Sequence, residues 1–252
     1  VGKYLHDSTG TNNMAFIPDL MNRKTYNEDG MGNMHLYTPW WLDNKNLDFP
    51  RGYHIEVWGG LGAPAYGFGF NYNSLNKYFG IEIGGDGDRV REEVKKYYGS
   101  TIGFSTRGEA VPNKNNYCEI DPEKKDKYGI PVLRFNYKWS DYERKQAKHM
   151  NETIKNIIHN IGGHMLWENG GPDNGLITPG EVIYEVGTTR MGNNPKTSVV
   201  NEYEQLHDAK NVFIVDGGPF VSQADKNPTW TIMALSWRTS ELIIEQLKKQ
   251  NI

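Results

Sequence analysis

The sequence predicts an α+β fold, because patterns typical of strands and patterns typical of helices occupy separate stretches of its 252 residues. Alternating or short continuous apolar runs predict strands at residues 53–58, 117–120, 131–137, 181–186 and 211–215. Helical periodicity with start and stop signals predicts helices at residues 88–98, 140–161 and 228–249.

The strand at residues 53–58 alternates apolar and polar side chains and runs into a loop of glycine and aromatic residues at 59–70. That loop serves either for turns and tight packing or as the lining of a ligand cavity. A polar turn separates the strands at 117–120 and 131–137. The short apolar run at 211–215 suits a buried strand.

The clearest helix begins at Ser140, which forms a capping-box pair with Glu143. Gly162 and Gly163 end it. We interpret its single apolar stripe as core, and the stripe consists of Ala147, Met150, Ile154, Ile157, Ile158 and Ile161. The charge-alternating helix at 88–98 is interpreted as a solvated surface.

The last helix is predicted to begin with Asn227 as its N-cap and Pro228 at its first helical position. Lys248 and Lys249 lie in its last turn, where positive charge is favourable. Residues 216–218, Asp-Gly-Gly, follow the predicted buried strand and precede this helix.

This strand–loop–helix corner suits an electron-rich cofactor edge. The first amides of a helix, here at Thr229 and Trp230, present unpaired N–H groups and the positive end of the helix dipole. Glycine allows close approach of the backbone, and Asp216 can accept from a ribose or ribityl hydroxyl. Taken alone the pattern is more typical of an ordinary connection between two elements.

Composition excludes several classes of protein. The net charge of −3 provides no general field to recruit nucleic acid or an anionic membrane surface. The longest apolar runs contain only a few residues, whereas a membrane-spanning helix needs about 20. Cys118 is the one cysteine, which excludes an internal disulfide and a multi-cysteine metal site.

Motifs for nucleotide and metal binding are missing from the sequence. It contains neither a P-loop nor a glycine-rich dinucleotide fingerprint after a strand, and its seven histidines lack metal-ligand spacing. No metal site is therefore predicted. His54 and His164 are kept as candidates for a cavity. The chain starts at Val1 without an initiator Met or a targeting segment, so we expect a processed chain or a fragment whose compartment is undetermined.

Four stretches together resemble the glucose-methanol-choline (GMC) family of FAD-dependent oxidoreductases, in its C-terminal portion. They are VGKYLHD at 1–7, IDPEKKDKYGIPVLRF at 120–135, GTTRMGNNPKTSVVN at 187–201, and the segment 207–235, which contains HDAKNVFIVDGGPF and KNPTWTIMAL. Within the family the resemblance favours the branch of gluconate-dehydrogenase-like flavoprotein subunits and pyranose oxidase.

The resemblance implies how the chain is organised. Residues 1–10 would end a segment of an FAD domain. Residues 11–180 would form a substrate domain, with a large antiparallel sheet backed by helices. Residues 181–252 would complete the FAD site with a strand and a helix. The dinucleotide fingerprint of the family precedes this region, so an N-terminal FAD-binding half is expected as a partner.

The family oxidises an alcohol by removing its hydroxyl proton while hydride passes to the flavin of FAD. By resemblance, Asn227 would hold the substrate hydroxyl. Pro228 and the N–H groups of Thr229 and Trp230 would face the flavin, and Asp216 and Gly217 would take the ribityl–pyrophosphate contacts.

The family's usual catalytic His is replaced here by Tyr184. A tyrosine has an ordinary pKa of about 10, so it needs a nearby cation to act as a base at neutral pH. Three interpretations stay open: Tyr184 acts as acid and base tuned by a neighbour such as Arg190, His54 or His164 supplies the base, or catalysis is impaired. Tyr184 is also compatible with simple packing as a strand aromatic.

Abundant Trp, Tyr and Asn favour a sugar or polyol as substrate. The resemblance also implies small and electron-transfer subunits as partners, and it favours a dehydrogenase over an enzyme that reduces oxygen. The competing hypothesis is a carbohydrate-binding or scaffold module that retains the substrate domain without flavin or catalysis.

Overall fold

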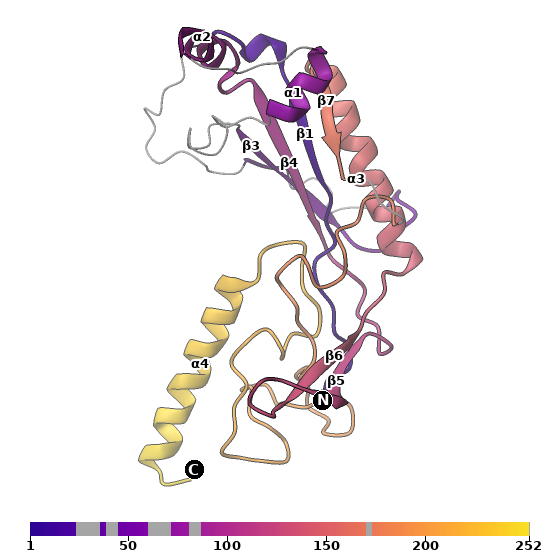
Figure 1. The fold of residues 1–252 in the computed structure, drawn as a ribbon. Helices are drawn as coiled ribbons and strands as arrows, with labels where there is room; N and C mark the ends of the chain where they lie inside the picture. The colour runs from indigo at the N-terminus through magenta and orange to yellow at the C-terminus, as the bar shows by residue number, and fades with distance from the viewer. Residues whose placement is uncertain (24–35, 39–44, 60–71, 81–86, 170–172, 252) are drawn as a thin grey trace.

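The computed structural model describes residues 1–23, 36–38, 45–59, 72–80, 87–169 and 173–251. Two regions follow each other along an elongated molecule (Figure 1). One region holds a sheet and three helices, and the other holds a hairpin, irregular segments and the C-terminal helix. Most of the glycine and aromatic loop at 59–70 lies outside the described residues.

The larger sheet has five strands in the order β2-β3-β4-β1-β7, and every neighbouring pair is antiparallel. Its strands are β1 (Asn12–Phe16), β2 (Leu36–Thr38), β3 (Tyr53–Gly59), β4 (Thr101–Gly108) and β7 (His164–Glu168). The predicted α+β class with an antiparallel sheet and helices is therefore confirmed.

Helix α3 (Asp141–Asn160) covers one face of this sheet. The predicted capping box is present. The backbone N–H of Ser140 donates to Glu143 Oε2 at 2.7 Å, and the Ser140 side chain accepts from a backbone N–H of the first turn. Met150, Ile154 and Ile158 of its stripe are buried against the strands, whereas Ile161 lies beyond the helix and is 42 % exposed.

Two short helices, α1 (Tyr72–Phe79) and α2 (Gly87–Tyr97), lie at the far end of the sheet, and a one-turn 3₁₀ helix, η1, spans Pro18–Leu20. Helix α2 confirms the helix expected at 88–98. Phe16 of β1 packs with Leu75 and Tyr97 in a second apolar cluster. Because neighbouring strand residues point to opposite faces, Ala15 faces α3 while Phe16 faces this cluster.

The same alternation divides the side chains of β3. Tyr53 and Ile55 lie in the core under α3, while His54 and Glu56 lie on the other face. Arg107 of β4 is the strand partner of His54 and therefore shares that face. One face of the sheet is thus apolar, and the opposite face carries polar groups.

The second region contains the hairpin of β5 (Tyr117–Lys125) and β6 (Pro131–Asn136), followed after residue 180 by irregular segments and α4 (Thr229–Lys248). The two hairpin strands were expected from the sequence. Helix α4 also confirms the expected C-terminal helix, and its buried Thr239 donates to Glu204 Oε2 at 2.7 Å.

Two predicted strands are wrong. At 181–186 only Val186 forms an isolated bridge, with His6, because Ile183 has a φ of 78° that breaks an extended backbone. At 211–215 only Phe213 forms a bridge, with Gln205. Val212 and Val215 are 38 % and 42 % exposed, so this run is not a buried strand.

Asp7 joins the N-terminal segment to the irregular part of the second region. Its buried carboxylate accepts from the backbone N–H groups of Ser8 at 2.7 Å and of Tyr184 at 3.2 Å. Its own N–H donates to the hydroxyl of Tyr137 at 2.9 Å. Burial, assisted by the charge of Glu185, raises the pKa of Asp7 to about 6.

Truncating the core at Ile154 should destabilise the sheet region strongly. Ile154 is fully buried between α3 and the sheet, so Ile154→Ala should lower the free energy of unfolding by about 2–5 kcal/mol. Urea denaturation of the chain measures this loss. Ile161→Ala, at the exposed end of the same stripe, is the matched control and should change it by about 0.5 kcal/mol. Equal losses would contradict this account of the core.

Asp7 should make folding less favourable as the pH rises. Its pKa is about 6 in the folded chain, against about 3.9 in an unfolded chain. The stability that comes from its protonated form is therefore fully present below about pH 4 and is lost as the pH rises through about 6. Asp7→Asn should therefore become more stable relative to the wild type by up to about 3 kcal/mol between pH 4 and pH 7. A difference in unfolding free energy that stays constant over this range would refute the assignment.

Candidate active site

The four sequence stretches quoted above lie against one another in the structure. Gly2 N donates to Thr188 O at 2.7 Å, and Cys118 N donates to Gly2 O at 2.9 Å. His6 and Val186 exchange backbone bonds of 3.1 and 2.8 Å. The N-terminal stretch therefore joins the start of β5 to the stretch that begins at residue 187.

The stretch 187–191 also runs beside the Asp-Gly-Gly loop. Thr189 N donates to Gly218 O at 3.1 Å and Met191 N donates to Pro219 O at 2.8 Å. A Cβ atom on Gly218 would lie 2.3 Å from Thr189 Oγ1, so glycine is required for this approach. All four stretches quoted from the sequence thus contact one another or lie on elements that do.

The start of α4 differs from the prediction by one residue. Its N-cap is Pro228, which has helical backbone angles (φ −83°, ψ −6°), and no side chain caps the helix. Asn227 is therefore not the N-cap, because the backbone has already entered the helical region at the next residue. Asn227 and Thr229 are exposed, and Trp230 is 88 % exposed. The first amides of α4 consequently have no side-chain cap and lie at an open surface.

The loop at residues 216–220, which precedes α4, is held by short hydrogen bonds and close packing. Asp216 Oδ1 accepts from Gly218 N at 2.7 Å, and the residue is exposed. Gly217 O accepts from Phe220 N at 3.2 Å. A Cβ atom on Gly217 would lie 2.9 Å from Val186 Cγ1. Asp216 and Gly217, which were expected to take the ribityl–pyrophosphate contacts, therefore lie in a tight turn packed on the stretch 186–189.

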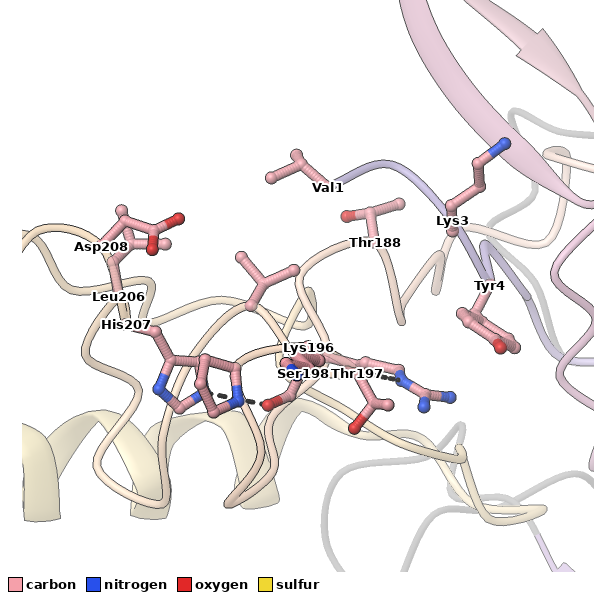
Figure 2. Close-up of a pocket in the computed structure, with 13 residues that line it drawn as sticks. Val1, Lys3, Tyr4, Thr188, Lys196, Thr197, Ser198, Leu206, His207 and Asp208 are labelled. Carbon is pink, nitrogen blue, oxygen red and sulfur yellow. Dashed lines mark hydrogen bonds between the residues drawn. The ribbon is translucent and has the colours of Figure 1, made fainter.

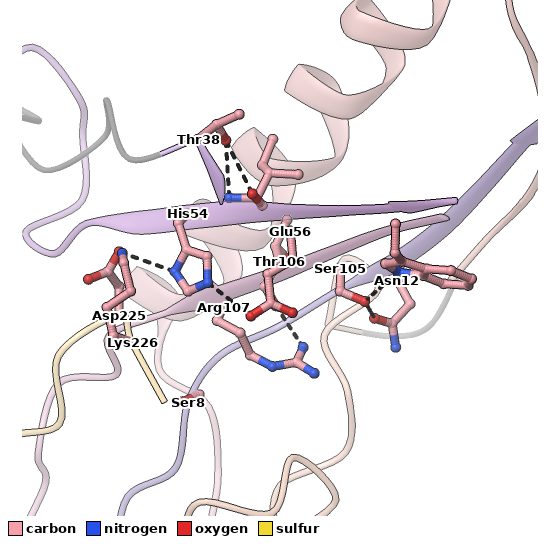
Figure 3. A network of polar contacts seen from close by, with 12 residues as sticks. Ser8, Asn12, Thr38, His54, Glu56, Ser105, Thr106, Arg107, Asp225 and Lys226 are labelled. Atoms are coloured by element: carbon pink, nitrogen blue, oxygen red, sulfur yellow. Dashed lines mark hydrogen bonds and ion pairs between the residues drawn. The ribbon is translucent and has the colours of Figure 1, made fainter. Parts of the chain in front are cut away.

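His54 lies at the centre of a buried polar network (Figure 3). Its Nε2 is 3.2 Å from Glu56 Oε1, and its Nδ1 is 3.3 Å from Asp225 Oδ2. Asp225 also forms an ion pair with Lys226. Burial lowers the pKa of His54, but its hydrogen bonds to Asp225 and Glu56 raise it above the ordinary value. Asp225 stands two residues before Asn227 in the sequence. The contact of His54 with Asp225 therefore links His54 to the segment that carries Asn227.

Tyr184 lies near the same network. It is half-buried, and the pKa of Tyr37 is raised by burial and by the charges of Glu56 and Tyr184. The ring of Tyr37 in turn lies 5.1 Å from that of His54. The guanidinium of Arg107 acts on Tyr37 in the opposite direction and lowers its pKa.

Arg190 is not positioned as the tuning cation that the sequence suggested. Its guanidinium lies over the ring of Tyr4, 4.1 Å from the centroid, and its Nε donates to Thr197 O at 3.0 Å. These contacts direct it toward the N-terminal stretch and the loop at 194–198. Arg107, the strand partner of His54, and Lys226, the ion-pair partner of Asp225, are cations that act on this cluster.

His164 lies apart from the other candidates. It begins β7, pairs with Phe16 and stacks near the rings of Phe16 and Tyr78, at 6.4 and 5.1 Å. Along β4 the partner of Phe16 is Thr101 and the partner of His54 is Arg107. Six strand residues correspond to about 20 Å. Asn227 thus follows a carboxylate partner of His54 by two residues, and Tyr184 acts electrostatically on Tyr37, whose ring lies by His54, whereas His164 lies at the other end of the sheet.

Sequence reasoning missed Glu56 and Asp225. The alternation of β3 was a usable signal for Glu56, since residues two apart in a strand share a face. No local signal identifies Asp225, because it is 171 residues from His54 along the chain.

A separate pocket opens among the motif stretches, with a volume of about 550 Å³ (Figure 2). It contains hydroxyl and cationic side chains, and Ser198 Oγ lies 2.9 Å from His207 Nε2. Its lining residues include Lys3, Arg190, Lys196, Thr197, Ser198 and His207. None of the site residues predicted from the sequence lines it.

In the part of the chain that the structure describes, every helix is too short or too polar to span a bilayer. Those same residues present no group of three or more His, Cys, Asp or Glu side chains that could hold a metal ion.

Comparisons with known proteins identify the family that this chain resembles. The family model described as "GMC oxidoreductase" matches residues 112–236. The 2-methyl-1,2-propanediol dehydrogenase of Mycolicibacterium austroafricanum is 30 % identical over 79 % of this chain and 34 % of its own length. The gluconate 2-dehydrogenase flavoprotein of Pantoea cypripedii is 30 % identical over 65 % of this chain and 27 % of its own length.

The chain thus spans about a third of the length of the curated relatives that it matches. Among solved structures, pyridoxine 4-oxidase from Mesorbium loti shares its fold with a TM-score of 0.54. That match covers 96 % of this chain and 43 % of the oxidase at 14 % identity. Residues 112–236 of this chain thus match the C-terminal domain of the GMC oxidoreductase family.

Proposed function

We propose that this chain forms the C-terminal part of a flavin-dependent oxidoreductase that oxidises an alcohol group of a sugar or polyol by hydride transfer to FAD. The observation that carries the proposal is the open, uncapped start of α4, which lies beside Asn227 and near the network of His54. Two relatives, a propanediol dehydrogenase and a gluconate dehydrogenase flavoprotein, support the class of reaction.

The residues around the start of α4 fit a flavin. Helix α4 has no side-chain cap, so the N–H groups of Thr229 and Trp230 suit an electron-rich ring edge. The ring of Pro228 fixes the backbone φ angle at the start of the helix. Asp216 and Gly217 would hold the ribityl–pyrophosphate part, since the exposed carboxylate of Asp216 has acceptor capacity beyond its bond to Gly218. When bound, FAD supplies the acceptor for the hydride.

The chain's own side chains would bind the substrate and move its proton. The exposed amide of Asn227 orients the substrate hydroxyl, and we assign the proton acceptor to Tyr184. Tyr184 acts electrostatically on Tyr37, as the Arg107 guanidinium also does.

The polar face of the sheet suits a substrate rich in hydroxyl groups. Ser105 Oγ donates to Asn12 Oδ1 at 2.8 Å, and Trp58 Nε1 donates to Ser105 Oγ at 3.4 Å. The indole of Trp58 lies directly over Gly103, where a Cβ atom would come within 2.0 Å of it. An aromatic ring beside amide and hydroxyl groups is a suitable surface for stacking and hydrogen bonding of a sugar ring.

Helix α4 also has a surface for the polypeptide that would complete the flavin site. A row of apolar side chains along it is strongly exposed: Trp230, Met233, Trp237, Ile244 and Leu247. Such a row on a helix is typical of a face that another polypeptide covers. We propose that the FAD-binding half of the enzyme covers it.

Assembly of the coloured enzyme tests the proposed function. Mixed with a polypeptide that carries the FAD-binding half, the chain should form a complex with flavin absorption that a sugar or polyol bleaches, while the chain alone should bind FAD weakly. Trp237→Asp should abolish assembly, because it places a charge in the 71 % exposed centre of the apolar row. Gel filtration with absorbance detection measures both.

Glu245→Gln changes the charge of the same helix outside the row and should assemble normally. A colourless complex would instead support the alternative, a non-catalytic carbohydrate-binding or scaffold module. Assembly of Trp237→Asp at wild-type affinity would reject α4 as the contact with the FAD-binding half.

Removing the hydroxyl of Tyr184 tests its role in proton transfer. In the assembled enzyme, Tyr184→Phe should slow flavin reduction by about 10²–10⁴-fold, which is the range for a lost general base. Stopped-flow absorbance measures the rate. Tyr142→Phe, at an exposed position on α3, should reduce its flavin normally. Flavin reduction at the wild-type rate in Tyr184→Phe would exclude this residue from the chemistry.

A further inference from the structure

His54 is enclosed between two carboxylates. It is fully buried, and each ring nitrogen lies within 3.3 Å of a carboxylate oxygen, from Glu56 on one side and Asp225 on the other. A neutral imidazole has a single N–H and can donate to one of them, whereas an imidazolium donates to both. The geometry therefore fits a protonated His54.

Charged and titratable groups surround His54 from several elements. Glu56 comes from β3, and Asp225 with Lys226 comes from the loop before α4. Arg107 of β4 is its partner across the sheet, and Tyr37 of β2 lies against its ring. The pKa of Glu109, just beyond β4, is raised by burial and by Asp225 and lowered by Arg51.

The contact connects distant parts of the chain. His54 belongs to the sheet, whereas Asp225 belongs to the loop that leads into α4. The same loop is held a second time by Gln223, whose Nε2 donates to Ser8 Oγ at 2.9 Å. Asn227 follows Asp225 by two residues, so a movement of Asp225 would move the amide of Asn227 and the start of α4.

We infer that His54 is a positioning residue, which, as an imidazolium held by Glu56 and Asp225, fixes the loop that places Asn227 and the first amides of α4. It is then not the proton acceptor of the reaction, because an imidazolium has no free lone pair to accept a proton. The positioning of Asn227 matters for catalysis only if the proposed function is correct, but the contact itself exists independently of it.

The pH sets the strength of this contact. Because the pKa of His54 is raised, its stabilising contribution is complete below the unfolded value of about 6.5 and is lost as the pH rises through the folded value. Above that value one carboxylate loses its hydrogen-bond donor. The loop that contains Asp225 should then open more often.

Amide hydrogen exchange of the full 252-residue chain tests the inference without any flavin. After correction for intrinsic exchange, protection at residues 222–230 should fall by about 10-fold or more between about pH 6 and pH 9. His54→Gln should show the low protection of residues 222–230 at both pH values. Asp225→Asn should be insensitive to pH, because its amide can donate to a neutral His54 that still donates to Glu56.

His149→Gln is the matched control, since His149 also bonds within the fold, 2.7 Å from the Tyr53 hydroxyl, but lies on α3. It should leave protection at 222–230 unchanged. Equal, pH-independent protection in the wild type and in His54→Gln would overturn the inference.

Kinetics of the assembled enzyme separate the two roles of His54. A positioning role predicts that His54→Gln raises KM and lowers kcat by about 10-fold. It also predicts that Asp225→Asn keeps its activity at high pH, where the wild type loses activity. A loss of about 10³-fold or more in flavin reduction with unchanged loop protection would make His54 the base and overturn the inference. If no variant or wild type oxidises an alcohol, the proposed function fails, and hydrogen exchange alone decides the role of the contact.

Discussion

The arrangement of the site depends on one buried ionic contact, that of His54 with Asp225. The imidazole is fixed on a strand of the sheet, and the carboxylate lies in the loop that begins the C-terminal helix, 171 residues away. Two charges buried this deeply are tolerated only with partners, which Glu56 and Lys226 provide. Removing one partner would leave the other uncompensated, so the loop and the strand are tightly coupled.

This contact lies on the side of the sheet that α3 leaves uncovered. The apolar side packs under that helix, and the other side carries His54, Glu56 and Arg107. A strand that alternates between core and polar face can stabilise the domain and line a site at once. In this chain a single antiparallel sheet packs one side under α3 and presents polar groups on the other.

Local chemistry made part of this structure predictable. The capping box of Ser140 and Glu143 identified α3, and the alternation of residues 53–58 identified β3. The strand expected at 181–186 failed because Ile183 adopts a positive φ that its residue type does not suggest. Asp225 escaped prediction because a loop carboxylate acquires its partner only through tertiary folding. Alternation along a strand is encoded locally, whereas the ion pair across two regions is not.

The protonation state of the buried imidazole is the most direct measure of this account. Nitrogen-15 NMR of the intact chain, labelled at histidine, reports whether each ring nitrogen carries a hydrogen. At neutral pH both Nδ1 and Nε2 of His54 should show the shifts of a protonated ring, with slow exchange of both hydrogens. A neutral ring with one bare nitrogen at that pH would contradict the ionic contact and, with it, the positioning of the helix start.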